Sequence, residues 1–103
     1  MNSKLMFYKL VCLVFLCLSF SGYSQNKNIN GIVSDDSGMP LPGVNVIIKG
    51  TSTGASTDFD GEFNLSAATG QTLVFSYVGF KAKEVVVGNV NTYNVILDAD
   101  NAL

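Results

Sequence analysis

Short runs of apolar and β-branched residues, separated by Gly, Asp, Asn and Pro, make up the chain from residue 28 onward. Such runs are typical of β-strands, and no stretch in this part has the spacing of an amphipathic helix. The pattern therefore predicts an all-β domain. Its seven expected strands cover residues 29–34, 44–49, 55–58, 62–65, 72–78, 81–87 and 93–97.

Alternation of apolar and polar residues within these strands predicts which side chains face the core. It is clearest at 44–49, where every second residue is aliphatic and the residues between are Asn45, Ile47 and Lys49. Successive side chains of a strand point to opposite faces of its sheet, so one face is expected to be buried. The strand at 72–78 is apolar on both faces, which predicts a central position covered on both sides. The residues expected to point inward include Val44, Val46, Ile48, Phe63, Leu65, Tyr93, Val95 and Leu97.

Turn-forming residues separate the expected strands. Residues 35–38 suit a turn, and Asp60-Gly61 predicts a hairpin because glycine adopts positive φ without a steric penalty. Lys81 and Lys83 lie at the start of the sixth strand, as is typical of an edge strand protected against pairing with other chains. Seven short strands are too few for a wide barrel, so the sequence predicts a two-layer sandwich.

The first two dozen residues differ in composition from the rest. Residues 1–9 contain two lysines and no acidic residue, and an almost continuous apolar run follows at 10–20. A basic start, a short apolar run and small residues at a cleavage site characterise a secretory signal peptide. Gly22 and Ser24 supply the small residues before a cut at Gln25. Residues 1–24 are therefore expected to be a cleaved signal peptide.

Two other roles for this segment fit less well. An uncleaved membrane anchor is disfavoured because the apolar run is about half of the roughly 20 residues that a span needs. Lipid attachment is disfavoured because a small residue should precede the modified cysteine, whereas Leu16 precedes Cys17 and Val11 precedes Cys12. Both cysteines are expected to leave with the leader, and no membrane span is expected in the mature chain.

Without the leader, the chain contains no Cys, His, Arg or Trp, and its charged residues are four lysines and eight acidic residues, a net charge of −4. With no disulfide in an exported protein, stability has to come from packing. A basic face for phosphate backbones is absent, so nucleic-acid binding is not expected. The absence of histidine and cysteine removes the commonest catalytic base, the thiol nucleophile and the usual zinc ligands, so the domain is expected not to be an enzyme.

One motif resembles a calcium-binding loop. Four residues match positions 1, 3, 5 and 6 of an EF-hand: Ser56, Asp58, Asp60 and Gly61. Position 12 is Ala67, where the EF-hand needs a bidentate Glu to close around the ion. The flanking segments also read as strands, not helices. A plain hairpin turn is therefore expected, and no metal ligand is assigned.

Other candidate chemistry fails on similar grounds. The glycine-rich stretch 49–57 lacks the Gly-Lys-Ser/Thr ending of a phosphate loop and opens no helix. Asp58 and Asp60 have no apolar pocket nearby that would raise a carboxyl pKa, so an acid–base pair is not expected. The aromatic residues are interpreted as packing residues in preference to a ligand platform. They are Phe59, Phe63, Tyr77, Phe80 and Tyr93. No catalytic, cofactor-binding or metal-ligating residue is assigned, and no cofactor is expected.

A set of turn and core residues spread over 29–98 forms a recognisable combination. Its members are Gly31, 36–38, 40–44, 49–51, Gly54, 57–58, 60–61, Phe63, 75–77, 79–80 and 95–97. In this combination the chain resembles the carboxypeptidase regulatory-like domain. More narrowly, it resembles the version at the N-terminus of SusC/RagA-type TonB-dependent outer-membrane receptors of Bacteroidetes.

The resemblance implies a seven-stranded Greek-key β-sandwich of transthyretin (prealbumin) type, without catalytic residues. It implies a periplasmic location and a linker to the plug and barrel of an outer-membrane nutrient transporter, with a SusD-like lipoprotein and the TonB system as further partners. Residues 1–24 would then be the signal peptide, 25–98 the domain and 99–103 a linker or truncated C-terminus, so the chain is expected to be a receptor fragment. The alternative is a stand-alone secreted or surface module that binds a glycan or a protein partner.

Overall fold

The computed structural model of the chain describes residues 2–19 and 26–100. The first part is a single helix, α1 (Asn2–Ser19), which falls within the expected leader. No helix in these two ranges has the length and apolar character that crossing a membrane requires. The cleavage site expected between Ser24 and Gln25 lies outside the described residues, so the signal peptide stays a prediction.

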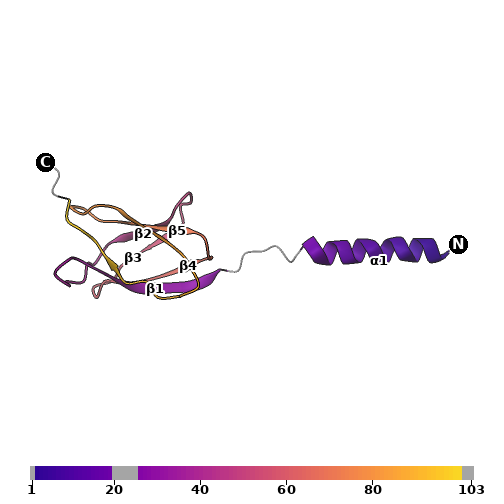
Figure 1. Ribbon diagram of the computed structural model, residues 1–103, viewed down its shortest axis with the longest axis horizontal. Coiled ribbons are helices and arrows are strands. Elements are labelled where there is room, and N and C mark those ends of the chain that lie inside the picture. Colours follow the sequence, from indigo (N-terminus) through magenta and orange to yellow (C-terminus); the bar gives the residue numbers. More distant parts are fainter. Residues whose placement is uncertain (1, 20–25, 101–103) are drawn as a thin grey trace.

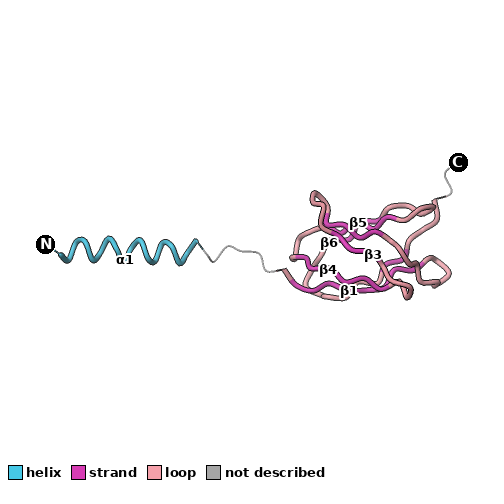
Figure 2. The backbone as a smooth tube through the Cα atoms, turned by 180° about the vertical axis from the view of Figure 1, so that it is seen from behind, coloured by secondary structure: helices cyan, strands magenta, loops and turns pink. Residues whose placement is uncertain are grey.

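Residues 26–100 form a sandwich of two β-sheets, which confirms the all-β, two-layer prediction (Figures 1 and 2). One sheet has the strand order β4-β1-β7 and the other has the order β3-β2-β5-β6. All paired strands are antiparallel except β1 and β7, which run parallel. The strands are β1 (Lys27–Ser34), β2 (Asn45–Ile48), β3 (Gly54–Ser56), β4 (Glu62–Ala67), β5 (Thr72–Ser76), β6 (Lys83–Val86) and β7 (Val95–Ile96).

The core fills the space between the two sheets. Val46 and Ile48 of β2 are buried, whereas the alternate residues Asn45 and Ile47 face outward, as the sequence pattern predicts. Phe63 of β4 meets Phe75 of β5 edge to face, with ring centroids 5.4 Å apart, so the two sheets touch through these rings. Burying one such side chain contributes about 1.5–3 kcal/mol to stability. The other large buried residues are Ile29, Val33, Leu41, Val44, Leu65, Leu73, Val87, Val95 and Leu97.

One expectation about the sheet β3-β2-β5-β6 is wrong, and one strand boundary differs. β5 does lie between two neighbours, but it is not covered on both sides: Val74 on its outer face is only half-buried, because the described chain supplies no third layer. β6 begins at Lys83 and not at residue 81. The reason is that Lys81 N donates to Asp98 O at 2.9 Å, which holds this residue against the end of the described chain.

The segment after β7 connects the two sheets. Leu97 N donates to Ser34 O of β1 at 2.9 Å, in one sheet. Two residues further on, Ala99 forms an antiparallel bridge with Phe80, which precedes β6 in the other sheet. Residues 97–100 therefore close one side of the sandwich.

The approach of β7 to β1 requires glycine at position 31. Tyr93 N donates to Asn30 O at 2.8 Å, which brings the chain before β7 across the middle of β1. A Cβ atom added at Gly31 would lie 1.7 Å from Tyr93 O, which is far inside van der Waals contact. Because the obstacle is backbone, it cannot rotate away as a side chain could.

We call the end of the sandwich at which β1 finishes the distal end. Thr57 lies there and is the only buried polar residue in the described part of the chain. Its Oγ1 donates to Leu41 O at 2.5 Å and accepts from Val44 N at 2.9 Å. Its main chain adds two bonds of 3.0 Å, from Gly43 N to Thr57 O and from Thr57 N to Val44 O. These four bonds fasten the loop at 35–44 to the segment that joins β3 and β4.

Replacing Gly31 with alanine should destabilise the sandwich, because the new methyl group would overlap Tyr93 O and push β7 from β1. We expect a loss of about 3 kcal/mol in the free energy of unfolding, the upper part of the range for overpacking. Urea denaturation measures it. In the matched control, Gly88→Ala, the nearest atom is Tyr93 Oη at 3.8 Å, so stability should change by less than about 0.5 kcal/mol. Equal stability of Gly31→Ala and the parent chain would contradict this account of the crossing.

Replacing Thr57 with valine should also destabilise the sandwich, although the two side chains have nearly the same shape. The change leaves Leu41 O and Val44 N buried without their hydroxyl partner, at a cost of about 2–4 kcal/mol for the pair. Thermal unfolding followed by circular dichroism gives the difference. Thr72→Val serves as the control, because Thr72 lies half-buried in β5 and no side-chain hydrogen bond is found for it within the described residues. If both variants unfold alike, Thr57 does not fasten the distal loop.

Candidate functional site

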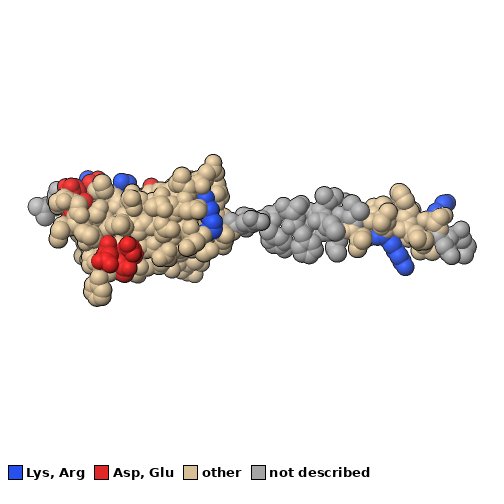
Figure 3. All heavy atoms as spheres, turned by 90° about the horizontal axis from the view of Figure 1, so that it is seen from below, with Lys and Arg blue, Asp and Glu red and all other residues tan. Residues whose placement is uncertain are grey.

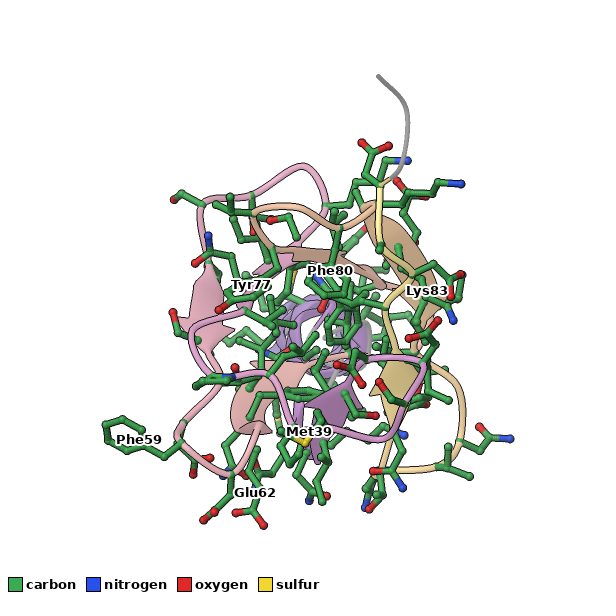
Figure 4. The ribbon with its side chains drawn as sticks, turned by 90° about the vertical axis from the view of Figure 1, so that its left-hand side faces the viewer. Met39, Phe59, Glu62, Tyr77, Phe80 and Lys83 are labelled. Carbon is green, nitrogen blue, oxygen red and sulfur yellow. The ribbon has the colours of Figure 1, made fainter. Side chains whose placement is uncertain are left out.

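The distal end gathers four segments that are far apart in the sequence. The strand directions place the loops at 35–44, 57–61 and 77–82 there, together with residues 97–100 (Figure 4). Seven of the eight acidic residues of the β-domain lie in these segments or at an adjoining strand end: Asp35, Asp36, Asp58, Asp60, Glu62, Asp98 and Asp100. On the face drawn in Figure 3, acidic side chains gather toward this end, which is on the left.

Asp35 organises the first distal loop. Its Oδ1 accepts hydrogen bonds from Met39 N and Ser37 N, each at 2.9 Å, and from Ser37 Oγ at 3.1 Å. The hydrogen bond from Met39 N contributes most, and together these bonds hold the pKa of the Asp35 carboxyl below its usual value. Partial desolvation acts in the opposite direction. A carboxylate with a lowered pKa is a weak base, so Asp35 has a structural role and is unsuited to general base catalysis.

The segment that resembles a calcium loop forms a tight turn. Asp58 Oδ1 accepts from Asp60 N at 2.9 Å and Glu62 N at 3.0 Å, and Gly61 N donates to Asp58 O at 3.0 Å. Gly61 has a φ of 76°, whereas Asp60 keeps a negative φ. The turn and the positive φ of Gly61 are therefore confirmed, but the hairpin prediction is wrong, because the strands on either side of the turn, β3 and β4, belong to different sheets and do not pair. Within residues 2–19 and 26–100, no group of three or more His, Cys, Asp or Glu side chains could hold a metal ion.

Within the glycine-rich stretch 49–57, residues 49–53 join β2 to β3, so the chain continues into a strand, not a helix. Its backbone groups are used within the hairpin: Ile48 N donates to Thr53 O at 2.9 Å, and Thr51 N donates to Ile48 O at 3.0 Å. A phosphate loop needs several amides that point together at the anion. The turn at 49–53 lies at the end of the sandwich opposite Asp58 and Asp60, so the backbone amides of this turn and the two carboxylates do not meet in one site.

The five aromatic residues do not form one platform. Phe63 is buried in the core, and Tyr93 is half-buried, with its hydroxyl oxygen accepting from Gly88 N at 2.7 Å. Tyr77 and Phe80 pack against each other at the distal end, with ring centroids 5.7 Å apart. Phe59 differs from all of these because it is 94% exposed and projects from the turn (Figure 4).

Two shallow grooves are present on the described surface of the β-domain. One, of about 440 Å³, lies on the outer face of β1 and β4 and is lined mainly by polar uncharged side chains such as Asn30, Asn64 and Asn94. The other, of about 400 Å³, lies at the distal end between Pro42 and Phe59. Neither brings a nucleophile and a base together. The geometry therefore offers surfaces for contact and no reactive centre within the described residues.

Sequence reasoning assigned Phe59 to packing and so missed its exposure. The available signal was its position between Asp58 and Asp60 in a predicted turn, since a residue at the tip of a turn has few neighbours. The half-exposed pair Tyr77 and Phe80 gave no such signal. Its exposure depends on where the turn before β6 points.

Comparison with known proteins gives a consistent family. The family model described as the CarboxypepD_reg-like domain matches residues 29–103. The TonB-dependent receptor SusC of Bacteroides thetaiotaomicron is 41% identical over 103 residues, which covers 99% of this chain and 10% of the receptor. A TonB-dependent receptor of Formosa agariphila is 52% identical over 75 residues, which covers 73% of this chain and 8% of the receptor. The chain thus spans about a tenth of the length of the curated relatives it matches.

Solved structures support the fold. A crystal structure of a type II cohesin–X-dockerin complex from Acetivibrio cellulolyticus contains a chain that superposes with a TM-score of 0.58 and 21% identity. The superposition covers 71% of this chain and 58% of that chain. At this identity the likeness concerns the β-sandwich fold alone. The family match over most of the chain is the stronger finding, and by it the protein belongs to the CarboxypepD_reg-like domain family.

Proposed function

We propose that residues 25–98 are a non-catalytic accessory domain at the N-terminus of a SusC-type TonB-dependent outer-membrane receptor. Residues 1–24 would direct export and be removed, which places the domain in the periplasm. The residues after 98 would link it to the plug and barrel, with a SusD-like lipoprotein and the TonB system as further partners. The domain would have the Greek-key topology of transthyretin.

The observation that carries this proposal is the coverage of the match to SusC. Nearly the whole of this chain matches, the leader included, but it accounts for only a tenth of the receptor. A domain that forms a small part of a transporter and is matched over its own full fold is best explained as a module of that transporter. The strand orders β4-β1-β7 and β3-β2-β5-β6 support the Greek-key topology, because neighbours in each sheet are mostly not consecutive in the chain.

A non-catalytic role is supported by the chemistry of the β-domain. Its sequence offers no histidine or cysteine, and the two best-organised carboxylates, Asp35 and Asp58, accept hydrogen bonds from their own turns. Such carboxylates are occupied as structural acceptors. The exposed side chains that take no part in closing turns, such as Phe59 and Val78, are suited to protein contacts.

A chimeric receptor tests the accessory role. The whole of this chain would replace the matching N-terminal region of SusC in Bacteroides thetaiotaomicron, beside a control that keeps residues 1–24 of this chain as the leader and lacks residues 25–103. We expect the chimera to reach the outer membrane and to retain TonB-dependent uptake, because the domain is an interchangeable module of the receptor. Release of the chain as a soluble secreted protein, or assembly no better than that of the deletion, would favour a stand-alone binding module instead.

Sequencing the N-terminus of the mature protein tests export separately. The same chimera, purified from outer membranes and sequenced from its N-terminus, should begin at Gln25, since Gly22 and Ser24 supply the small residues that signal peptidase requires. Ser24→Leu should block cleavage at this position, whereas Tyr23→Leu is the control that should not. A protein that still begins at Met1 would show that the leader is retained.

A further inference from the structure

Apolar and aromatic side chains lie along the distal end, from the turn at Phe59 to the turn before β6. Phe59 and Pro42 line the same groove, and the backbone at Gly43 passes close to the next ring, since a Cβ added there would lie 3.8 Å from Tyr77 Cε1. Tyr77 in turn packs on Phe80. Val78 stands between these two rings in the sequence and is 92% exposed. We call Pro42, Phe59, Tyr77, Val78 and Phe80 the distal strip.

The two most exposed members of the strip are held on rigid turns. Phe59 sits in the turn that Asp58 closes with two side-chain hydrogen bonds, and that turn is fastened to the neighbouring loop by buried Thr57. Val78 occupies the corner of a turn closed by the bond from Phe80 N to Tyr77 O at 3.1 Å. Single exposed apolar residues are common on protein surfaces, whereas several of them gathered at one end of a domain on ordered turns favour an interaction surface. Rigid display also lowers the entropy lost on binding.

Charge around the strip indicates the kind of partner. Asp58 and Asp60 flank Phe59, and Asp98 and Asp100 lie on either side of Ala99, which pairs with Phe80. Carboxylates therefore stand at both ends of the strip. The distal segments and adjoining strand ends hold seven acidic residues against two lysines, Lys81 and Lys83. A complementary surface would carry lysine or arginine around an apolar patch.

The fold also indicates where such a surface would be found. The last described residues, 97–100, lie at the distal end, so any polypeptide that follows them starts beside the strip. In SusC the matched region is only a tenth of the receptor. We propose that the distal strip docks onto a lysine- or arginine-bearing apolar surface in the part of the receptor polypeptide that follows this domain. This inference rests on the proposed function and names the partner of the domain within it.

Site-specific photocross-linking in the SusC chimera tests the docking. The photoreactive amino acid p-benzoylphenylalanine would be placed at position 59 and, as the matched control, at Asn64, which is exposed on the outer face of β4, the strand that follows the same turn. Phe59 is almost fully exposed, so the replacement should leave the fold intact. We expect an intramolecular cross-link from position 59 to a SusC peptide that contains lysine or arginine, and none above background from position 64.

Charge reversal provides a second readout. Asp60→Lys combined with Asp98→Lys, which reverses one carboxylate at each end of the strip, should lower the cross-link yield from position 59 about threefold or more, since like charges would then oppose each other. Neither carboxylate closes a turn, so both loops should keep their shape. The control is Asn28→Lys combined with Asn64→Lys, which adds the same lysines to the outer face of β1 and β4 and should leave the yield unchanged.

The outcomes separate this inference from the proposed function. A chimera that assembles and transports but gives no cross-link from position 59 above that from position 64 overturns the docking alone. A cross-link between two copies of the chain, or only to another protein, overturns it as well because the partner is then different. Failure of the chimera to assemble contradicts the proposed function, and the docking inference falls with it.

Discussion

Contact between the inner faces of the two sheets is the interaction on which the rest of the structure depends. Phe63 and Phe75 meet across this interface, and aliphatic side chains surround them. The β-domain has no cysteine to form a disulfide, and its one described ion pair, Lys49 with Glu84, lies at the surface, where such pairs contribute little. Burial of apolar surface is therefore the main source of stability.

The loops at the distal end are ordered because they are anchored to that core. Thr57 brings a hydroxyl into the apolar interior only because Leu41 O and Val44 N satisfy it there. Asp35 and Asp58 each accept hydrogen bonds that close their own turns. The distal surface therefore consists of turns held by side chains rather than of free loops. A domain of this size can in this way present a defined surface at one end.

The sequence predicted those features that a local pattern determines. Val44, Val46 and Ile48 could be placed inward because alternation has only two solutions, and the Asp60-Gly61 turn followed from the φ that glycine allows. Features that depend on distant segments were missed. The half-exposed face of β5 depends on whether a third layer exists, the role of Gly31 on the approach of Tyr93, and the exposure of Phe59 on the direction of the turn between β3 and β4. Neighbouring residues in the sequence determine none of these three features.

Amide hydrogen exchange of the leaderless chain, measured residue by residue by NMR, tests the central claim most directly. If packing between the sheets orders the whole domain without a metal, ligand or disulfide, amides of Ile29, Val33 and Phe75 should exchange slowest. The amide of Val44 donates a hydrogen bond to Thr57 Oγ1, so it should be protected almost as strongly, although Val44 lies in a loop. Rapid exchange at Val44 together with slow exchange in the strands would contradict a rigid distal end, and rapid exchange throughout would contradict an independently folded sandwich.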